Sequence, residues 1–505
     1  MAAVEDRGRR AGTETETETG EGEVPWARGR FAMREMKLFL CGERRDGSDV
    51  MSVRSPFDGR EVARVARGGP AELEAAAAAA ERAARAMAAL TAVERVAILE
   101  RASALVGELC EPLAEIICEE AGKPIALARV EVERCRDTFT EAAAVARHPM
   151  VEARDLSGYA SGAGRLGLVR RVPVGPILAI TPFNFPLNLV AHKLAPAIAA
   201  GCPVVLKPAS QTPSPSLMLA DILAESGLPV GGLAVIPSRG ADAQELASDE
   251  RFALLTFTGS PLVGWRLKEL AWRRRVTLEL GGNAAVVVEP DVDDVDDIAR
   301  RIAAAAYGYA GQSCISVQRV LVHEDLYMSM RRALTEATEA VAYGDPSLDG
   351  VVCGPLIDET NAERVMQWIG DAREAGGRLL TGCDREGNMV SPTLLEEVPE
   401  NQPVVADEVF GPVACLDAYE DFEQALLMVN DSRYGLQAGI FTNDTSKVQA
   451  AWAHLEVGGI IVGDLPTWRT DPMPYGGVKG SGAGREGPRY AWREMTEERL
   501  LVLKR

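Results

Sequence analysis

The sequence predicts an α/β protein with more than one domain. Its 505 residues exceed the size of a single hydrophobic core, and at about 150 residues per domain they predict about three domains. Short apolar runs alternate with helical segments over about 100 residues from position 174 onward, and a second alternating stretch begins near residue 284. This alternation is typical of βαβ units, in which helices cover a parallel sheet.

The first third of the chain is expected to be a polar tail followed by helices. Residues 1–36 are predicted to be a disordered acidic tail, since they are polar and include alternating Thr and Glu. Ordered structure is expected from Lys37, first as short strand-like runs broken by Gly, Asp and Pro. Alanine-rich helices are predicted over residues 70–118, where apolar residues recur every three or four positions, and another over about 125–146.

The central stretch predicts a binding crevice. Four apolar runs that are predicted to be strands are followed or closed by Asn184, Lys207, Gly259 and Glu279. Ligands of parallel sheets bind in the crevice at the carboxyl ends of the strands. These four residues are therefore expected to lie near one ligand.

The charge balance and the cysteine usage exclude several classes of protein. Lys and Arg number 54 against 74 Asp and Glu, a net charge of −20, whereas nucleic-acid binding needs a basic face. No run of about 18 uncharged apolar residues predicts a membrane span, and no apolar export signal is visible. The nine cysteines are therefore expected to be reduced thiols in a cytoplasmic protein. Neither they nor the four scattered histidines show the spacing of zinc ligands, so no metal is expected.

Three residues are candidates for catalysis. Cys314 follows a predicted helix in the small, polar loop GQSC, which could leave a nucleophilic thiolate accessible, although a lone cysteine is more often inert. Glu279 ends an apolar strand before two glycines, where burial would raise its pKa toward that of a general base; the alternative is a surface glutamate. Asn184, between Phe and Pro residues in PFNFP, could donate to an oxyanion or form an ordinary Asx turn.

A glycine-rich turn and a lysine suggest a nucleotide. FTGSPLVG places Gly259 and Gly264 around a strand-to-helix turn, where backbone N–H groups can meet a pyrophosphate, but it lacks the GxGxxG spacing. Lys207 ends the strand VVLK and could hydrogen-bond to ribose hydroxyls. Each of these signals is weak alone.

Together the motifs resemble one family. PFNFP, LKPAS, FTGS, LELGG, GQSC, EVFGPV and PYGGVKGSG occur in this order, and the set resembles the aldehyde dehydrogenase superfamily from about Lys37 to the C-terminus. Within it, the resemblance is to non-acylating branches such as the succinate-semialdehyde, non-phosphorylating glyceraldehyde-3-phosphate, lactaldehyde and phosphonoacetaldehyde dehydrogenases.

The resemblance implies three structural parts. A Rossmann-like NAD(P)-binding domain would comprise residues 37–155 and 173–281, and an α/β catalytic domain residues 282–465. A small β arm, from residues 156–172 and 466–505, would pair with another subunit, giving a homodimer or homotetramer.

The resemblance also implies a role for each matching residue. Cys314 would be the nucleophile, Glu279 the base, and Asn184 with the Cys314 N–H the oxyanion hole. Lys207 and Glu408 would hold the cofactor riboses. The remaining expected cofactor-binding residues are Thr181, Phe183, Ser210, Gly240, Thr258, Gly259, Ser260, Gly264, Leu280 and Phe410, the last packing near the nicotinamide.

The reaction implied is oxidation of an aldehyde to the acid through a thiohemiacetal and a thioester. Family members that prefer NAD often carry a glutamate after LKPA, where this chain has Ser210, so NAD or NADP is expected. Arg469, with Arg319, is the candidate for binding an anionic small aldehyde, phosphorylated, phosphono or carboxylated, and Ser313 for lining the pocket. The alternative for Arg469 is a structural arginine paired with a carboxylate.

Three other functions remain as alternatives. A CoA-acylating semialdehyde dehydrogenase would pass the thioester to CoA, but members of that type usually lack the glutamate that stands here as Glu279. A catalytically silent scaffold would be expected to have lost Cys314, Glu279 or Asn184, and all three are present. Thioester hydrolysis by Cys314 without redox turnover would need no NAD(P).

Overall fold

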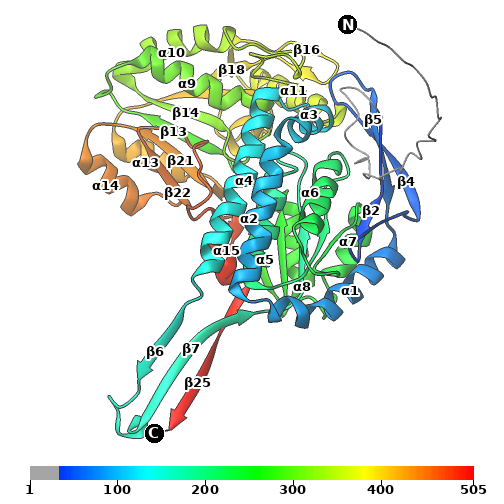
Figure 1. Ribbon diagram of the computed structural model, residues 1–505. Coiled ribbons are helices and arrows are strands. Elements are labelled where there is room, and N and C mark those ends of the chain that lie inside the picture. The colour runs from blue at the N-terminus through cyan, green and yellow to red at the C-terminus, as the bar shows by residue number, and fades with distance from the viewer. Residues whose placement is uncertain (1–32, 505) are drawn as a thin grey trace, which may run out of the picture.

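The computed structural model describes residues 33–504 and contains two open sheets and a projecting arm (Figure 1). Most of the tail predicted over 1–36 lies outside the described residues. Its last residues do not fit that prediction, because β1 (Arg34–Met36) pairs in parallel with β5 (Glu61–Arg67). The α/β class predicted from the alternating segments is confirmed.

The first sheet has eight strands in the order β24-β12-β11-β8-β9-β10-β2-β3. Its inner strands β8 to β12 run parallel, while β2, β3 and β24 pair antiparallel at the edges. The strands are β2 (Leu38–Leu40), β3 (Glu43–Arg45), β8 (Ile177–Ile180), β9 (Val204–Lys207), β10 (Leu233–Val235), β11 (Leu254–Thr258), β12 (Arg275–Glu279) and β24 (Gly482–Ala483).

Helices cover both faces of this sheet, which is why its strands are apolar throughout. Along β8, Ile177 and Ala179 join one core, and Leu178 and Ile180 join the other. The first core packs against α2 (Ala92–Glu108), α3 (Cys110–Ala121), α4 (Ile125–Arg147), α5 (Asn188–Ala200) and α6 (Ser214–Glu225). The second packs against α1 (Pro70–Ala89), α7 (Gly240–Leu246) and α8 (Pro261–Ala271). Buried alanines of α1 let that helix lie close to the strands.

The second sheet has seven strands in the order β15-β18-β19-β14-β13-β21-β22, parallel except for β15. The strands are β13 (Ala284–Val288), β14 (Val317–His323), β15 (Arg378–Thr381), β18 (Thr393–Glu396), β19 (Val413–Tyr419), β21 (Gln437–Phe441) and β22 (Gly459–Val462). Its helices are α9 (Val295–Tyr307), α10 (Glu324–Glu339), α11 (Glu359–Glu374), α12 (Pro403–Ala406), α13 (Phe422–Asn430) and α14 (Thr445–His454).

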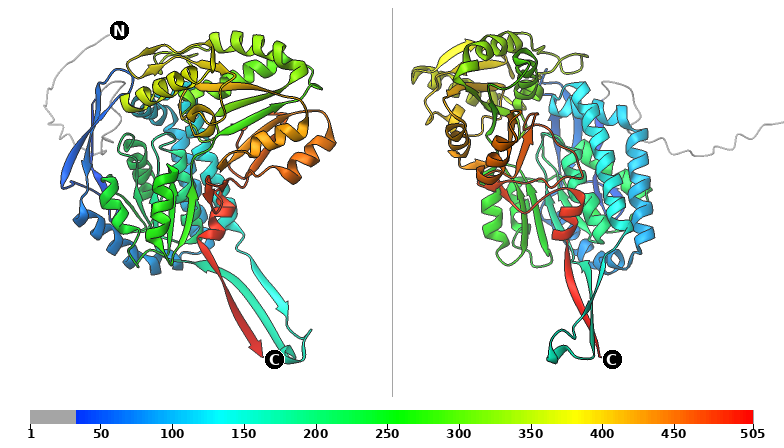
Figure 2. Two further views of the ribbon diagram at one scale, coloured as in Figure 1. Left: turned by 180° about the vertical axis from the view of Figure 1, so that it is seen from behind. Right: turned by 90° about the vertical axis from the view of Figure 1, so that its left-hand side faces the viewer.

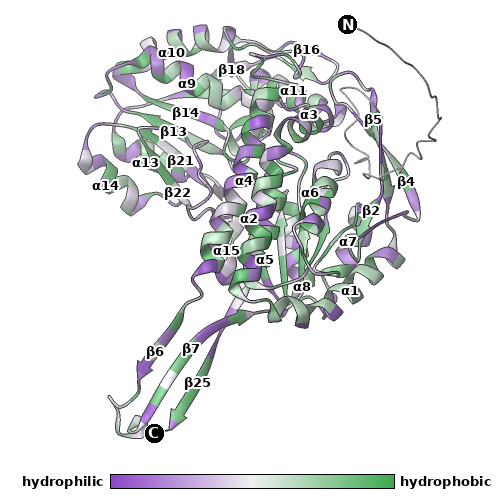
Figure 3. Ribbon diagram, in the orientation of Figure 1, coloured by the Kyte–Doolittle hydropathy of each residue, from purple (hydrophilic) through white to green (hydrophobic). Residues whose placement is uncertain are grey.

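The arm is a three-stranded antiparallel sheet that projects from the body of the molecule (Figures 1 and 2). Its strands are β6 (Val151–Asp155), β7 (Arg165–Pro173) and β25 (Thr496–Lys504), with the short helix η1 (Ala160–Gly162) near its tip. Hydrophobic and hydrophilic residues both occur along these strands (Figure 3), and consecutive apolar residues from Leu500 to Leu503 are exposed.

Two boundaries differ from the predicted ones. Residues 151–155 belong to the arm as β6, not to the first domain, because their backbone pairs with β7. Most of the segment 466–505 is not in the arm either: β24 joins the first sheet, and α15 (Pro488–Glu494) packs against α5 and α4.

The remaining strands form small sheets. These are β4 (Asp49–Arg54) with β5 and β1, β16 (Arg385–Glu386) with β17 (Met389–Val390), and β20 (Tyr434–Gly435) with β23 (Val478–Lys479). Within residues 33–504, no helix is both long and apolar enough to cross a membrane.

Candidate active site

A cavity of about 420 Å³ lies between the carboxyl ends of the first sheet and the loop that carries Cys314. It brings together most of the residues predicted from sequence. Those that line it are Phe183, Asn184, Thr258, Gly259, Ser260, Glu279, Leu280, Ser313, Cys314, Glu408, Phe410 and Arg469. The parallel register explains the meeting, since Thr258 of β11 pairs with Glu279 of β12 and both strands end there.

Five other predicted cofactor residues lie outside the lining of this cavity. Lys207 ends β9 with a largely buried ammonium, and burial lowers its pKa. No charged or hydrogen-bonding neighbour within residues 33–504 contributes to that shift, and the buried hydroxyl of Thr181 has no partner there. Ser210 is exposed, and Gly240 begins α7 with open space around it. Gly264 packs in α8 so closely that a Cβ would lie 2.3 Å from Leu280 Cδ2.

The prediction that Arg319 binds substrate is wrong. Its guanidinium is buried in the second sheet and donates hydrogen bonds to the backbone carbonyls of Met428, Val429 and Asn283. It does not line the cavity that holds Cys314. Arg319 instead ties β14 to the end of α13.

The Cys314 thiol is held in a buried loop after a strained turn. In η2 (Gly308–Gly311), Tyr309 and Ala310 have φ values of 54° and 53°, a left-handed conformation that is unfavourable for residues with a Cβ. Cys314 Sγ lies 2.9 Å from the Tyr475 hydroxyl. Burial raises the pKa of Cys314 to about 12, although the hydrogen bond from Tyr475 acts in the opposite direction. The resting group is therefore a thiol that must lose its proton to a nearby base.

Asn184 meets the cysteine loop directly. It lies in the turn between β8 and α5, and its Nδ2 donates to the backbone carbonyl of Gln312 at 3.0 Å. Gln312 is itself anchored, since its side chain bonds to the backbone of Tyr309, Pro355 and Ile357. The amide has a second N–H on the same nitrogen, so Asn184 can hold this contact and still donate to an oxygen near the thiol.

Glu279 is a buried carboxyl without a hydrogen bond. Both of its oxygens lack a partner among residues 33–504. Burial raises the pKa of Glu279 well above its usual range, and the negative charge of Glu486 raises it further. A carboxylate with a raised pKa is a strong proton acceptor, which is the property that a general base needs.

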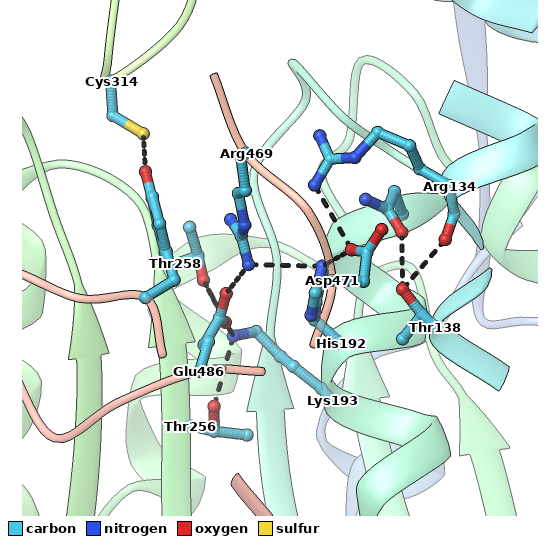
Figure 4. A network of polar contacts seen from close by, with 12 residues as sticks. Arg134, Thr138, His192, Lys193, Thr256, Thr258, Cys314, Arg469, Asp471 and Glu486 are labelled. Carbon is cyan, nitrogen blue, oxygen red and sulfur yellow. Dashed lines mark hydrogen bonds and ion pairs between the residues drawn. The ribbon is translucent and has the colours of Figure 1, made fainter. Parts of the chain in front are cut away.

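Glu486 is ionised because cations surround it (Figure 4). Lys193 Nζ lies 2.9 Å from Glu486 and also donates to Thr256 and Thr258 at 3.2 and 2.7 Å. Burial alone would raise the pKa of Glu486, but Lys193 and its other cationic neighbours hold it at about 2. Glu279 and Glu486 are thus two carboxyl groups whose surroundings drive their pKa values in opposite directions.

Arg469 lies between these carboxyls and the thiol. Its guanidinium stacks 3.6 Å from the centroid of the Tyr475 ring, and Nη2 lies 3.4 Å from Glu486. Nη2 also lies 3.2 Å from Nε2 of His192. Nε of Arg469 is buried and has no partner within residues 33–504.

Arg134 enters the same cavity from α4, and Asp471 holds it there (Figure 4). Asp471 lies 3.3 Å from Arg134 and 2.7 Å from Nε2 of His192. Burial and the charge of Arg469 lower the pKa of His192, so the ring is neutral. Since Nε2 faces an ionised carboxylate, it must carry the proton and donate to Asp471. The contact between His192 and Arg469 is then one between two donors, and Glu486, at 3.4 Å, is the carboxylate that pairs with the Arg469 charge.

The other half of the cavity is aromatic and can hold a dinucleotide. Phe410 and Phe183 meet edge to face at 5.9 Å. Glu408 accepts a hydrogen bond from the Gly282 N–H at 3.0 Å, and burial raises its pKa to about 7. A Cβ at Gly281 would lie 2.5 Å from the Glu408 carboxylate, so only glycine leaves this approach open.

Several cavity residues were not predicted from the sequence. They include Arg134, Arg364, Trp368, Tyr475 and Glu486, with His192, Lys193 and Asp471 behind them. Tyr475 and Glu486 belong to the glycine-rich motif near the C-terminus, which could have signalled them. Arg134 stands among other charged residues of a helix and has no local signal. Within residues 33–504, no three His, Cys, Asp or Glu side chains are grouped as metal ligands.

Comparisons with known proteins agree with this site. The model described as "Aldehyde dehydrogenase family" matches residues 43–501. A 3-sulfolactaldehyde dehydrogenase of Priestia aryabhattai is 40% identical over 472 residues, which are 93% of this chain and 98% of the relative. Aldehyde dehydrogenase 21 of Physcomitrella patens, solved with its product succinate, has a TM-score of 0.92 at 41% identity and covers 94% of this chain and 99% of its own.

A third relative was solved with a dinucleotide. The NADP-dependent glyceraldehyde-3-phosphate dehydrogenase of Bacillus halodurans C-125, complexed with NADP, has a TM-score of 0.90 at 34% identity. The match covers 93% of this chain and 99% of that chain. From the extent of these matches and the geometry of the site, the chain belongs to the aldehyde dehydrogenase family.

Proposed function

We propose that this enzyme oxidises a small anionic aldehyde to the carboxylic acid with NAD or NADP as cofactor. The observation that carries the proposal is the position of two guanidinium groups, Arg134 and Arg469, in the same cavity as Cys314, Glu279 and Asn184.

The charge of the cavity wall favours an anion. Three guanidinium groups line the cavity, those of Arg134, Arg364 and Arg469. Of the carboxyl groups in the lining, Glu486 has a lowered pKa and is ionised. Burial raises the pKa values of Glu279 and Glu408, which disfavours a negative charge on either carboxyl. The guanidinium groups of the wall therefore outnumber the carboxylates whose charge is stabilised there, and an anionic ligand would offset that excess.

The arginines also have free hydrogen-bond donors. Nε of Arg134 and Nε of Arg469 are both buried without a partner among residues 33–504. A carboxylate, sulfonate or phosphonate offers two or three oxygens that match such donors. Two relatives are named as dehydrogenases of 3-sulfolactaldehyde and of sulfoacetaldehyde, and a third binds succinate; all three molecules carry an anionic group of this kind.

The residues of the cavity fit a nicotinamide dinucleotide. The largely buried ammonium of Lys207 and the unpaired hydroxyl of Thr181 lie at the strand ends where ribose hydroxyls would bind, and Glu408 would hold the second ribose. Ser210 has no negative charge that would repel a 2′-phosphate, which is consistent with NADP as well as NAD. The cofactor, when bound, supplies the hydride acceptor.

The protein's own groups supply the other steps. Glu279 takes the thiol proton, and the Cys314 sulfur attacks the aldehyde carbon. Asn184 Nδ2 and the Cys314 N–H stabilise the resulting oxyanion. Glu279 then releases that proton to solvent. After oxidation leaves a thioester on Cys314, the Glu279 carboxylate deprotonates the water that attacks the thioester, which releases the acid and returns the Cys314 thiolate. The charge of Glu486 keeps Glu279 basic enough for this step.

The arm is the proposed site of assembly. It has little contact with the body of the chain in Figures 1 and 2, and Leu500, Leu501, Val502 and Leu503 are exposed on β25. Apolar strands that project into solvent are typical of a subunit interface. We therefore propose a homodimer or homotetramer built through this arm.

The test is the reduction of cofactor, followed by absorbance at 340 nm. Purified protein is assayed with NAD and with NADP against neutral, carboxylated, sulfonated and phosphonated aldehydes, and Cys314→Ala is the control. Faster reduction with the anionic aldehydes, lost in Cys314→Ala, is the expected result. Equal turnover of neutral aldehydes would refute the anionic substrate. Reduction only after CoA is added would refute hydrolysis as the second step.

A further inference from the structure

One fully buried lysine has no part in the proposed reaction. Lys123, in the turn between α3 and α4, is 1% exposed and forms an ion pair with Glu131, whose side chain is fully buried. Its Nζ lies 3.7 Å from the centroid of the Phe185 ring and 4.6 Å from that of Tyr309. The two rings meet edge to face at 6.4 Å, so the ammonium sits in the angle between them.

The carboxylate of the pair holds the loop that carries Asn184. Glu131 Oε1 accepts hydrogen bonds from the N–H groups of Leu187 and Asn188, at 2.9 and 3.1 Å. These are among the first N–H groups at the start of α5, which have no partner within the helix. Phe185, which contacts Lys123, lies in the same loop one residue after Asn184.

The ammonium also touches the loop that carries Cys314. Tyr309 has a left-handed backbone and stands five residues before the thiol. Its hydroxyl donates to the Ala121 carbonyl at 3.1 Å, so both ends of the Tyr309 side chain are held by the turn around Lys123. Gln312, which bonds to Tyr309 through its side chain, accepts the hydrogen bond of Asn184 on its backbone.

We propose that Lys123 and Glu131 are positioning residues that set the distance between Asn184 and the Cys314 N–H, the two halves of the oxyanion hole. The inference rests on the proposed function, because it assigns these two groups to the oxyanion. Neither residue of the pair lines the cavity, so the pair acts only through the two loops.

A gain in stability alone does not explain why an ion pair is buried at this position. A buried ion pair is often no more stabilising than apolar residues of the same volume, since both charges lose their water. The charges here also fix the positions of the two loops. One oxygen of the Glu131 carboxylate binds two N–H groups of one loop, and the Lys123 ammonium contacts an aromatic ring from each loop.

The test removes the charges and keeps the shape. The double variant Lys123→Met/Glu131→Gln leaves a carbonyl oxygen to accept from Leu187 and Asn188 and leaves no unpaired charge. We expect kcat to fall about 10- to 100-fold, as for a misplacement of about 1 Å. KM for the aldehyde should stay within about threefold, because the oxyanion contact is made in the transition state.

The chain offers a matched control. Lys447 and Glu289 form another lysine–glutamate pair with a fully buried carboxylate, joining α14 to the end of β13, and Lys447 lies 5.8 Å from the Phe422 ring. They do not line the cavity. Lys447 is 31% exposed, against 1% for Lys123, so Lys447→Met/Glu289→Gln should lower stability by less, and it should leave kcat unchanged.

A second measurement does not depend on turnover. Hydrogen exchange followed by mass spectrometry should show faster exchange in residues 183–188 and 309–315 of the Lys123/Glu131 variant, and not in the control pair variant. If the double variant does not fold, Phe185→Leu removes one ring contact while it keeps the ion pair, and exchange should rise in the same two segments.

The outcomes separate the two proposals. A wild-type enzyme that reduces no cofactor refutes the proposed function, and the exchange data still decide whether the pair holds the loops. Unchanged exchange in both segments, or a fall in kcat without faster exchange, would overturn the positioning role. Equal losses of kcat in the two pair variants would also overturn it, because the effect would then belong to any buried ion pair.

Discussion

Replacing Arg134 with methionine should weaken the use of anionic aldehydes specifically. Arg134 lines the cavity, its side chain is 23% exposed, and its one ion-pair partner within residues 33–504 is Asp471 at 3.3 Å. A hydrogen bond to a charged group contributes about 1.5–3 kcal/mol. At about 1.4 kcal/mol for each factor of ten, loss of this contact should lower kcat/KM for an anionic aldehyde about 10- to 150-fold.

The variant should still fold, because Asp471 keeps a second partner. His192 Nε2 donates to it at 2.7 Å, so the carboxylate is not left without a hydrogen bond. The matched control is Arg136→Met on the same helix, where the guanidinium is half exposed and pairs with Glu133. Circular dichroism and thermal melting of both variants check the fold before kinetics are compared.

The assay compares succinate semialdehyde with pentanal, a neutral aldehyde of similar length. For Arg134→Met we expect the large loss with succinate semialdehyde and a change of less than about threefold with pentanal, as for a surface substitution. An equal loss with both aldehydes would mean that Arg134 supports the shape of the cavity and does not bind the anion. No loss with either would refute the charge argument.

Three further predictions follow from the same geometry. Glu486→Gln removes the negative charge that raises the pKa of Glu279, so the acidic limb of the kcat/KM profile should move to lower pH; an unchanged limb would contradict the pairing. Tyr475→Phe removes the hydrogen bond that lowers the pKa of Cys314, so alkylation by iodoacetamide at fixed pH should slow, as measured by mass spectrometry. Deletion of residues 496–505 should reduce the oligomer to monomers in sedimentation velocity, and an unchanged mass would exclude the arm as the interface.

The part of the site that lies at strand ends could be predicted from the sequence. Asn184 and Glu279 follow apolar runs, and parallel strands place their carboxyl ends at one edge, so their meeting follows from the alternation alone. Cys314 could be added only through the motif around it, because its loop belongs to the second sheet and no local pattern gives its distance from Glu279.

The positions of site residues on helices, and on loops near the C-terminus, could not be predicted from the sequence in this way. Arg134 is one of several charged residues of α4, and only the packing of α4 against α5 turns it into the cavity. Arg134 was missed, whereas Arg319 was wrongly included. This arginine of a buried strand was expected to bind the substrate, but it donates to three backbone carbonyls. Local sequence gives the residue type, but the direction of a long side chain depends on contacts far along the chain.

The position of β24 has a consequence for synthesis of the chain. Among the described residues, the strand that carries Glu279 is covered on its outer edge by Gly482 and Ala483, which are synthesised long after it. Before β24 has been synthesised, the nascent chain already contains Cys314, Arg134 and Arg469. At that stage β12 still has an open edge, and Glu486 has not yet been added. Activity therefore begins only after the segment that contains β24 and Glu486 has been synthesised and has folded. A chain that stops shortly before β24 would be inactive and would expose a strand edge prone to aggregation.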